Sequence, residues 1–429
     1  MWRKGRRIDG TDRVEGTLDD KAILRALFDA ALAAAYPDGK FAGRLPEPPK
    51  GRTIVIGAGK GAARMAAAFE AEWPGACEGL VVTRYGHGMA TRAIEVVEAA
   101  HPVPDEAGMA AAARILALAQ SAGPDDLVVC LMSGGASALL TLPADGVTLA
   151  DKQAVNKALL KSGAPIGAMN QVRKALSAIK GGRLAAAAAP ARLVTYLISD
   201  VPGDEPRSIG SGPTVPEASD AEAALAILKR YEIAVPAAIE AAIRANVIKD
   251  VPAPAPMHML ATPHMALEAA AAKAREFGLT PLILGDALEG EAREVATVLA
   301  GIGRSVAEHD EPAKRPCVLL SGGETTVTVR GKGRGGRNAE FLLAFALASQ
   351  SVPGISAIAC DTDGIDGSED NAGAIVDGDL IAQAKARGID LVAHLANNDA
   401  YSAFSALDRL VVTGPTLTNV NDFRAILVR

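Results

Sequence analysis

Four cations and four glycines lie together in one short stretch of the chain. They are Arg330, Gly331, Lys332, Gly333, Arg334, Gly335, Gly336 and Arg337. Glycines let backbone amides approach an anion closely, and a helix expected to begin at Asn338 adds the positive end of its dipole. Lysine and arginine supply charge, and arginine adds forked donors. The stretch therefore suits a polyphosphate or a small carboxylate; the alternative is a surface hairpin with solvated charges.

A short apolar run precedes this stretch. Residues 318–320 predict a buried strand, and Ser321, Gly322 and Gly323 predict a turn whose backbone N–H groups are free. The β-branched residues 325–329 then predict a second strand. We therefore expect the turn at Gly322 and Gly323 to be open to an anion.

A second glycine-rich turn follows the strand predicted at 53–56. Residues 57–62 spell GAGKGA and fit a loose dinucleotide fingerprint, G-x-G-x-x-A. That fingerprint needs an acidic residue at the end of the next strand, where Thr83 and Arg84 stand instead. An NAD site is therefore disfavoured, whereas Arg84 leaves NADP open. Lys60, at the start of a helix, suits an anionic oxygen; the alternative is a solvated lysine.

A third turn, SGGAS at residues 133–137, follows the strand predicted at 126–132. It is of the anion-binding type, and the alternative is a tight turn in which Ser137 caps a helix. The nucleophile elbow of serine hydrolases, G-x-S-x-G, is not present there.

Three carboxylates gather on one turn after a predicted apolar strand: Asp361, Asp363 and Asp366. Their spacing fails the EF-hand pattern, because apolar residues occupy two of its ligand positions. Carboxylates in such a place can hold Mg²⁺ or accept a hydroxyl proton, and the alternative is turn chemistry within the loop. Asp200 and Asp204 form a similar pair.

Composition excludes several classes of protein. The net charge of −6 argues against a general nucleic-acid binder, because a phosphate backbone demands a basic surface. The four cysteines show no metal-like spacing and fit a reducing compartment. Residues 1–16, expected to be loosely attached, lead into no apolar signal segment, and no apolar run reaches membrane-spanning length. We therefore expect a cytoplasmic protein with no nucleic-acid or membrane partner, while a homodimer stays open.

Predicted strands and helices alternate along the chain. Strands of nearly continuous apolar character predict a parallel sheet with helices on both faces. Strands are expected at 53–56, 79–83, 94–98, 126–132, 193–198, 280–284, 318–320, 325–329, 357–360 and 409–412. Helices are expected at 18–36, 63–72, 107–119, 149–189, 265–277, 290–304, 341–348 and 379–387. The proline-rich segment 252–256 predicts a semi-rigid link, so we expect an N-terminal domain at 18–250 and a C-terminal domain at 257–429.

Many strings spread along the chain carry a resemblance to one known family. They are GAGK (57–60), RYGHG (84–88), HPVPDE (101–106), MSGGAS (132–137), MNQVRK (169–174), KGGRL (180–184), SDVPGD (199–204), GSGPT (210–214), LSGGETTV (320–327), GKGRGGRNAE (331–340), DTDGIDG (361–367) and TGPTLTNVND (413–422). The sequence resembles the class II glycerate 2-kinases, whose C-terminal half is called the MOFRL domain. The resemblance implies an α/β protein of two domains: an N-terminal Rossmann-like parallel sheet with helices on both faces and a C-terminal α/β MOFRL domain.

The resemblance also implies an activity, the phosphorylation of D-glycerate to 2-phosphoglycerate with ATP and Mg²⁺. Members of the family are also labelled hydroxypyruvate reductase, a name linked to tartrate-utilisation operons. An NAD(P)H-dependent reductase is therefore the main alternative, and a non-catalytic anion-binding protein is a third hypothesis.

The resemblance, together with the chemistry of the turns, gives the residues expected roles. Catalysis is expected of Lys60, Arg337 and Asp363. Substrate binding is expected of Ser133, Gly134, Gly135, Ser137 and Arg334. Nucleotide binding is expected of Gly322, Gly323, Asn338, Thr416 and Asn419. Binding of Mg²⁺ is expected of Asp363 and Asp366. The site should lie in a cleft between the two domains.

Overall fold

Six parallel strands form the first sheet, in the order β3-β2-β1-β4-β5-β6. The computed structural model describes residues 19–349 and 352–429. The strands of this sheet are β1 (Thr53–Ala58), β2 (Glu78–Arg84), β3 (Ile94–Ala99), β4 (Leu127–Met132), β5 (Arg192–Ile198) and β6 (Met257–Ala261). β1 and β4 are buried along their whole length, as parallel strands covered on both faces must be. The predicted parallel N-terminal sheet is confirmed.

Helices cover both faces of this sheet. One face packs on α2 (Ala62–Glu72), and the other on α3 (Glu106–Gln120), α4 (Ala136–Leu139) and α7 (Arg183–Ala188). Alternate strand residues serve the two faces: Val55 joins the core that contains Met65 of α2, whereas Ile54 joins the core that contains Ile115 of α3.

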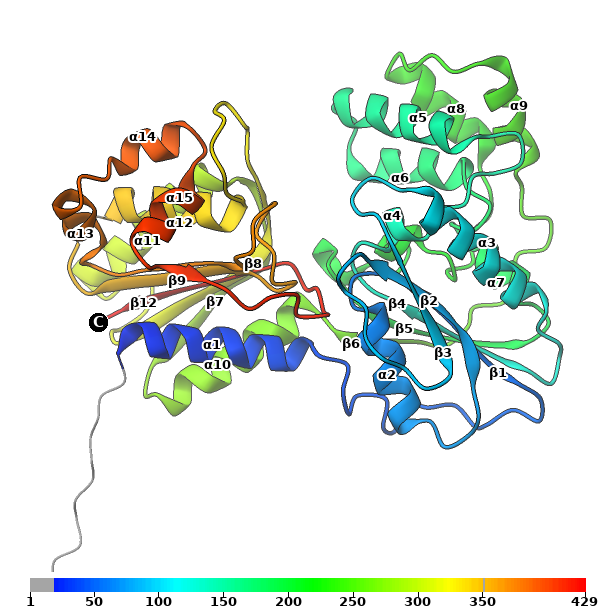
Figure 1. The fold of residues 1–429 in the computed structure, drawn as a ribbon, viewed down its shortest axis with the longest axis horizontal. Helices are drawn as coiled ribbons and strands as arrows, with labels where there is room; N and C mark the ends of the chain where they lie inside the picture. Colours follow the sequence, from blue (N-terminus) through cyan, green and yellow to red (C-terminus); the bar gives the residue numbers. More distant parts are fainter. Residues whose placement is uncertain (1–18, 350–351) are drawn as a thin grey trace, which may run out of the picture.

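Four further helices form a group that we call the helical subdomain. They are α5 (Leu149–Lys161), α6 (Ile166–Ala175), α8 (Ala221–Arg230) and α9 (Ala237–Ala245). They lie beyond α4 at the upper right of Figure 1 and have a small core of their own, which includes Val155, Val172 and Leu228. Two short 3₁₀ turns, Pro202–Asp204 and Ile209–Ser211, lie in the segment between β5 and α8.

The second sheet is mixed and also has six strands, in the order β11-β10-β9-β12-β8-β7. They are β7 (Thr280–Glu291), β8 (Cys317–Thr326), β9 (Ile355–Asp361), β10 (Gly373–Val376), β11 (Leu410–Val411) and β12 (Asp422–Val428). β7 and β8 are parallel, and the other neighbours are antiparallel. Both faces are again covered by helices.

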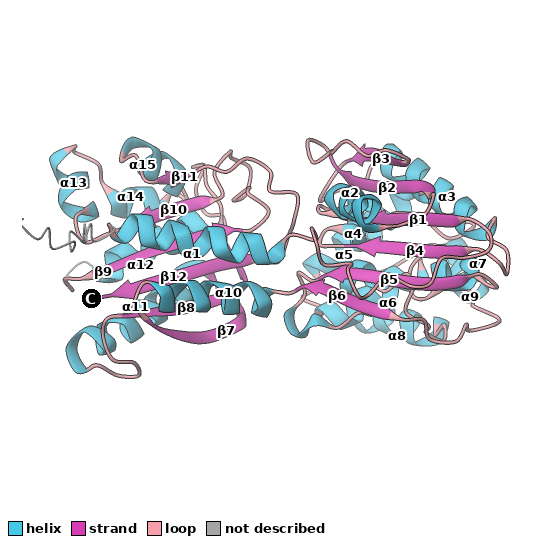
Figure 2. Cartoon of the chain, turned by 90° about the horizontal axis from the view of Figure 1, so that it is seen from below, coloured by secondary structure: helices cyan, strands magenta, loops and turns pink. Residues whose placement is uncertain are grey.

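The helices of the second sheet come from both ends of the chain. α1 (Asp20–Ala35) and α10 (Pro263–Glu276) lie side by side on one face, as Figure 2 shows. α11 (Ala292–His309) and α12 (Arg337–Ser349) cover the other face. Three short helices complete this unit: α13 (Leu380–Ala386), α14 (Leu391–Ala396) and α15 (Ala400–Ala406).

The two sheets divide the chain differently from the expected ranges 18–250 and 257–429. α1 packs on the second sheet although it opens the chain, and β6 pairs with β5 in the first sheet although it follows the proline-rich link. One buried core contains residues of both units, such as Leu27 of α1, Phe69 of α2 and Leu320 of β8. The chain therefore crosses between the units twice.

Three predictions about the second sheet are wrong. Ser321–Gly323 form no turn, because they lie inside β8 and pair with β7 and β12 on either side. Residues 327–329 are not strand. The strand predicted at 409–412 is not the last one, because β12 follows it and occupies a central place in the sheet. The expectation for residues 1–16 concerns a segment outside the described residues. Within the residues described, no helix is both long and apolar enough to cross a bilayer.

Candidate active site

The candidate site lies where the carboxyl ends of β1 and β4 meet the second unit. Two segments of that unit reach this edge: the turn after β9 and the loop 412–421 before β12 (Figure 1). The contact is direct, since Nζ of Lys60 lies 2.6 Å from Oδ2 of Asp363 and Asn419 donates to Asp200 at 3.0 Å. Ligands of open α/β sheets bind at this edge.

Lys60 stands on the tight turn between β1 and α2. The N–H groups of Gly59 and Lys60 donate to backbone carbonyls at 3.0 and 2.8 Å, and that of Gly61 donates to Oγ of Ser133 at 2.9 Å. Gly59 has a φ of 133°, and a Cβ there would stand 2.2 Å from the same Oγ, so the turn requires glycine. These three amides are therefore used within the protein, which leaves them unavailable to the pyrophosphate of a dinucleotide.

Both side chains of the Lys60–Asp363 pair are charged. Burial opposes the charge of Lys60, but the carboxylates of Asp363 and Asp361 outweigh it and raise the pKa of the lysine. Burial likewise opposes the charge of Asp363, but Lys60 outweighs it and lowers the pKa of that carboxyl. Asp361 behaves differently: burial and then the charge of Asp363 hold its pKa well above the usual range.

Arg337 binds three carboxylates at the start of α12. Its guanidinium lies 2.9 Å from Asp361, 2.8 Å from Asp422 and 2.8 Å from Glu324. Burial disfavours the charge of Arg337 and by itself would lower its pKa, but the three carboxylates outweigh burial and raise the pKa. Asp361 also accepts the N–H of Asp363 at 3.0 Å. The structure therefore joins all three predicted catalytic residues in one network, with Asp361 as the link.

The predicted turn after β4 lies directly against this network. The carbonyl of Gly134 accepts the N–H of Lys60, and a Cβ on Gly134 would stand 2.2 Å from Asp200 and 2.3 Å from the Asn419 amide. Burial raises the pKa of Asp200 to about 6. Ser137 lies inside α4 and so is not its cap; its Oγ is 2.8 Å from Oγ of Ser211.

His101 also belongs to this edge. A Cβ on Gly135 would stand 3.2 Å from Nε2 of His101 and 3.2 Å from the stem of Lys60. Burial and the nearby cations Lys60 and Arg84 lower the pKa of His101 to about 4, so its ring is neutral at ordinary pH.

The structure places three predicted site residues elsewhere. Gly322 and Gly323 lie within β8, between two partner strands, so their amides do not form an open turn. Arg334 is mostly exposed; it lies 3.3 Å from Glu369 and its guanidinium covers the ring of Tyr401. None of these contacts involves Lys60 or Asp363.

Asn338 and Asp366 shape the start of α12. The carboxylate of Asp366 accepts the N–H of Asn338 at 2.9 Å with one oxygen and that of Ala339 at 2.8 Å with the other. Both oxygens are thus engaged by the end of a helix. The side chain of Asn338 donates to Asp422 at 2.8 Å, so it supports a partner of Arg337.

Thr416 and Asn419 lie in the loop 412–421 that reaches the first unit. Thr416 is bound to the turn after β9, because its N–H donates to the carbonyl of Asp363 at 3.1 Å and its hydroxyl to that of Thr362 at 2.5 Å. Asn419 faces the other way, toward Asp200. The loop therefore links the carboxylates of both units.

Sequence reasoning left three residues of this region out of the expected site: Asp200, His101 and Asp422. Asp200 follows β5 and His101 follows β3, so both stand after predicted strands of the parallel sheet. A position directly after a strand of the parallel sheet is also what identified Lys60, so the same criterion could have identified Asp200 and His101. Asp422 opens a strand that was not predicted, and so it carried no such signal.

The carboxylates beside Lys60 fit a magnesium ion of the kind that phosphoryl-transfer enzymes use. In the part of the chain that is described, no three His, Cys, Asp or Glu side chains gather into a protein-only metal cage. Mg²⁺ needs less, since it is usually bound by one or two carboxylates together with waters and substrate phosphates. Asp363 and Asp200 both lie close enough to Lys60 to raise its pKa. Asp366 fits less well than Asp363, because both of its oxygens accept backbone N–H groups, whereas only one oxygen of Asp363 does.

Comparison with known families matches most of the chain. The profile of a domain of unknown function (DUF4147) matches residues 23–244, and that of the MOFRL family matches residues 317–422.

Individual relatives match it over nearly their full lengths. A protein of Agrobacterium vitis, provisionally named hydroxypyruvate reductase, is 54% identical over 95% of this chain and 94% of its own. The D-glycerate 2-kinase of Thermotoga maritima is 40% identical over 94% of this chain and 97% of its own. The crystal structure of the glycerate kinase of Thermotoga maritima superposes with a TM-score of 0.87 and 39% identity, covering 95% of this chain and 99% of that one.

Proposed function

The chain belongs to the family of glycerate kinases with a MOFRL domain, and we propose that it transfers the γ-phosphoryl group of ATP to the 2-hydroxyl of D-glycerate. The observation that carries this proposal is the contact between Lys60 and Asp363, at 2.6 Å, across the two units. It places a cation and a carboxylate, both charged, at the edge where ligands of such sheets bind. Phosphoryl transfer is largely positioning and charge stabilisation, which this pair can supply.

The reaction assigns each residue of the network a task. The 2-hydroxyl oxygen attacks the γ-phosphorus, the bond from that phosphorus to the β–γ bridging oxygen breaks, and ADP leaves with the electron pair. Lys60 stabilises charge on the transferred group. The hydroxyl proton passes to Asp363, because the charge of Lys60 outweighs burial and keeps this carboxylate deprotonated.

Substrate carboxylate and metal are bound by the flanking groups. The turn at Ser133, Gly134 and Gly135 lies beside Lys60 and offers the glycerate carboxylate a glycine-lined wall. Glu324, the half-exposed partner of Arg337, can be displaced by an anionic oxygen of a substrate, which the Arg337 guanidinium then binds. Asp200 and Asp363 would hold Mg²⁺, which would neutralise charge on the phosphates.

A reductase is the competing function, because the relative from Agrobacterium vitis carries that name. Two features argue against it. The turn amides at Gly59, Lys60 and Gly61 donate within the protein, so no pyrophosphate finds them free. β2 ends at Arg84 and not at an acidic residue that would bind the ribose of NAD, so this second feature argues against NADH, whereas the first argues against both cofactors.

A single pair of assays on the purified protein separates the two functions. One assay follows ADP formation from ATP, Mg²⁺ and D-glycerate, and the other follows loss of NADH or NADPH absorbance with hydroxypyruvate. We expect ADP formation that requires D-glycerate, and no cofactor oxidation above the rate of a heat-inactivated sample. Cofactor oxidation without ADP formation would establish the reductase instead.

The same proposal places the enzyme in the cytoplasm. Its four cysteines are free thiols, which a reducing compartment maintains, and ATP is supplied there.

A further inference from the structure

A second pocket, of about 620 Å³, lies between the candidate active site and the helical subdomain. His101 and Gly135 form one end of it, and both also stand beside Lys60. α5 and α6 form the other end. Its volume lies in the range of small-molecule sites.

Three cations of this pocket, two buried and one half-buried, have no carboxylate partner in the described part of the chain. Lys152 is 9% exposed, and its Nζ has no hydrogen-bond partner among the described residues. Lys180 is 1% exposed and donates to the carbonyls of Ser137 at 2.8 Å and Gly210 at 3.4 Å. Arg173 donates to the side chain of Asn156 at 2.7 Å. Among the described residues that line the pocket, none is acidic.

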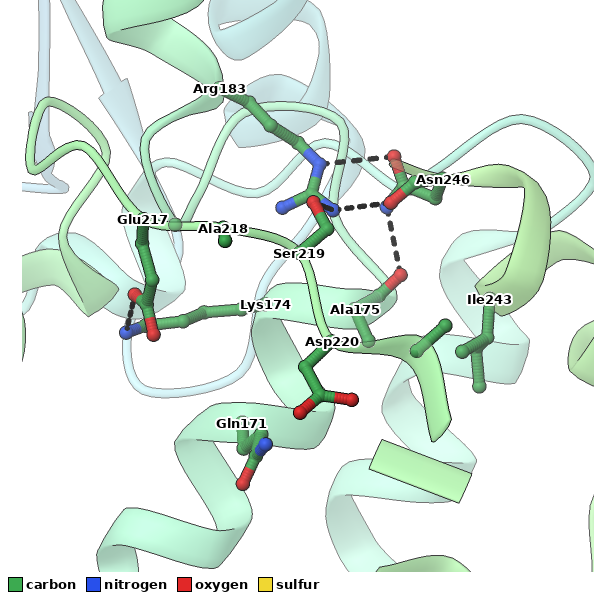
Figure 3. A pocket seen from close by; sticks show the side chains of 12 residues that line it. Gln171, Lys174, Ala175, Arg183, Glu217, Ala218, Ser219, Asp220, Ile243 and Asn246 are labelled. Atoms are coloured by element: carbon green, nitrogen blue, oxygen red, sulfur yellow. Dashed lines mark hydrogen bonds and ion pairs between the residues drawn. The ribbon is translucent and has the colours of Figure 1, made fainter. Parts of the chain in front are cut away.

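The cations of the candidate active site, by contrast, are paired with carboxylates. Lys60 and Arg337 bind four carboxylates between them. In the small neighbouring cavity of Figure 3, Lys174 reaches Glu217 at 2.6 Å and Arg183 donates to Asn246 at 3.0 Å. Burying several unpaired cations is costly unless an anion joins them. The pocket is therefore built for a ligand with several negative charges.

The remaining walls of the pocket are apolar. Val103 and Leu160, which are 63% and 61% exposed, line it together with Leu149 and Val155. A free phosphate would leave this apolar part empty, whereas the base and ribose of a nucleotide would cover it. Lys180 connects the cationic part to the turn after β4, because it donates to the carbonyl of Ser137. Gly135 of the same turn stands beside Lys60, where a terminal phosphoryl group has to arrive.

We propose that this pocket binds the nucleoside triphosphate, with its phosphates on Lys152, Arg173 and Lys180 and its base against the apolar wall. This inference rests on the proposed kinase function and deepens it, because it assigns the nucleotide to the first unit and its helical subdomain. Arg173 and Lys180 lie in MNQVRK and KGGRL, two strings to which the sequence alone assigned no role.

The substitution Lys152→Met tests the inference, and Lys161→Met on the exposed side of the same helix is the control. Calorimetric titration of ATP without D-glycerate gives the Kd, and steady-state kinetics gives the KM of each substrate. We expect Lys152→Met to raise the Kd and KM for ATP by at least about tenfold, the effect of losing one charge-assisted contact. The KM for D-glycerate should stay within about twofold, and Lys161→Met should match the wild type.

Unchanged ATP binding in Lys152→Met, or a raised KM for D-glycerate alone, would overturn the inference. The two proposals fail separately: ATP binding that depends on Lys152 without turnover of D-glycerate would remove the kinase function but keep the site. Arg173→Met gives an independent second variant.

Thermal unfolding with added anions separates two sources of phosphate. Tripolyphosphate should raise the Tm of the wild type but not that of Lys152→Met, whose own Tm should not fall, because an unpaired buried charge is removed. A shift that depends on Lys152 with 2-phosphoglycerate and not with tripolyphosphate would assign the pocket to the product and contradict the inference.

Discussion

The buried cations of this molecule differ in whether a carboxylate neutralises their charge. Lys60 and Arg337 are each matched by carboxylates and stay charged at any ordinary pH. Lys152 is buried without a partner, and burial followed by the charge of Arg173 lowers its pKa to about 8. The paired cations Lys60 and Arg337 form a site suited to a metal and a small acid. The unpaired Lys152 is suited to binding a polyanion.

Replacing Lys60 by methionine should abolish turnover. We expect kcat to fall at least about 100-fold, because a cation at the transferred group is lost. The free energy of unfolding should also fall by about 3 kcal/mol, because Asp363 is left as an unpaired buried charge. Steady-state kinetics and chemical denaturation measure both effects, with Lys50→Met on the exposed surface as control. Full turnover in Lys60→Met would place the chemistry elsewhere.

The pKa of Lys152 predicts opposite pH trends for folding and for nucleotide binding. In the folded state the pKa of Lys152, about 8, lies below the ordinary lysine value of 10.5, so folding disfavours the proton. The resulting penalty is about 3 kcal/mol below pH 8 and disappears as the pH rises toward 10.5. Without nucleotide, stability from this group should therefore increase over that range.

ATP affinity should fall over the same range, because the cation is lost. The charge of Arg173 adds to burial in favouring the loss of the Lys152 proton. Burial, followed by the charges of Lys152 and Arg173, lowers the pKa of the neighbouring Lys180. Urea denaturation and calorimetric titration between pH 7 and 10 measure the two trends. Lys152→Met is the control, because it lacks the contribution of Lys152 to the pH dependence of both stability and ATP affinity. Identical pH profiles in the wild type and Lys152→Met would refute this assignment.

At the scale of elements, the turn between β4 and α4 holds the site together. Gly134 leaves no room for a side chain, because a Cβ would stand 2.2 Å from Asp200 and 2.3 Å from Asn419. Both neighbours are ends of side chains, and so they would move rather than prevent folding.

The substitution Gly134→Ala should therefore impair catalysis more than stability. We expect kcat/KM to fall about 100-fold, the effect of misplacing catalytic groups by an ångström, while the Tm changes little. Gly301→Ala on α11 is the matched control, since nothing lies within 4 Å of its Cβ position. Kinetics and thermal denaturation of both variants test this, and an unimpaired Gly134→Ala would show that Asp200 and Asn419 are not needed.

Sequence patterns predicted strands β1 to β5 of the first sheet because they form mostly apolar runs, but they missed β6, which follows the proline-rich link. They also brought Lys60 and Gly134 together, since turns after neighbouring strands of a parallel sheet meet at one edge. Asp363 follows β9 of the second sheet, and only the expected cleft between the two domains related it to Lys60. β8 was misjudged because Gly322 and Gly323 have the composition of a turn. The strand needs Gly323 for another reason: a Cβ there would stand 2.2 Å from the carbonyl of Leu288 in β7.

β12 could not be predicted because its sequence, DFRAILV, contains charges in a central strand. Asp422 and Arg424 are both buried and lie 2.5 Å apart, so each is compensated by the other. Such a pair is visible only in three dimensions. The same holds for the contact of Asp422 with Arg337, which joins residues far apart in the sequence.

Over the whole molecule, the two units share one core and exchange elements. Leu27 of α1 is fully buried in a core that also contains residues of both sheets. Arg429 at the end of the chain pairs with Asp20 of α1 at 2.6 Å. The site lies between the units, so its geometry depends on how they are held together.

The shared core predicts that the protein unfolds in one cooperative transition. Leu27→Ala should shift that transition as a whole and reduce the free energy of unfolding by about 2–5 kcal/mol. Val298→Ala is the control, since Val298 is 64% exposed and its loss should matter little. Scanning calorimetry tests this: two resolved transitions, or a shift of only one part, would mean that the units fold independently.

The central claim is that this chain phosphorylates the 2-hydroxyl of D-glycerate, and the most direct measurement is the ³¹P NMR spectrum of the product. Purified protein is incubated with D-glycerate, ATP and Mg²⁺, and the spectrum is compared with authentic 2- and 3-phosphoglycerate. The account predicts the 2-phosphoglycerate signal together with ADP. A spectrum with 3-phosphoglycerate, or with ATP unchanged while hydroxypyruvate is reduced in parallel, would contradict it.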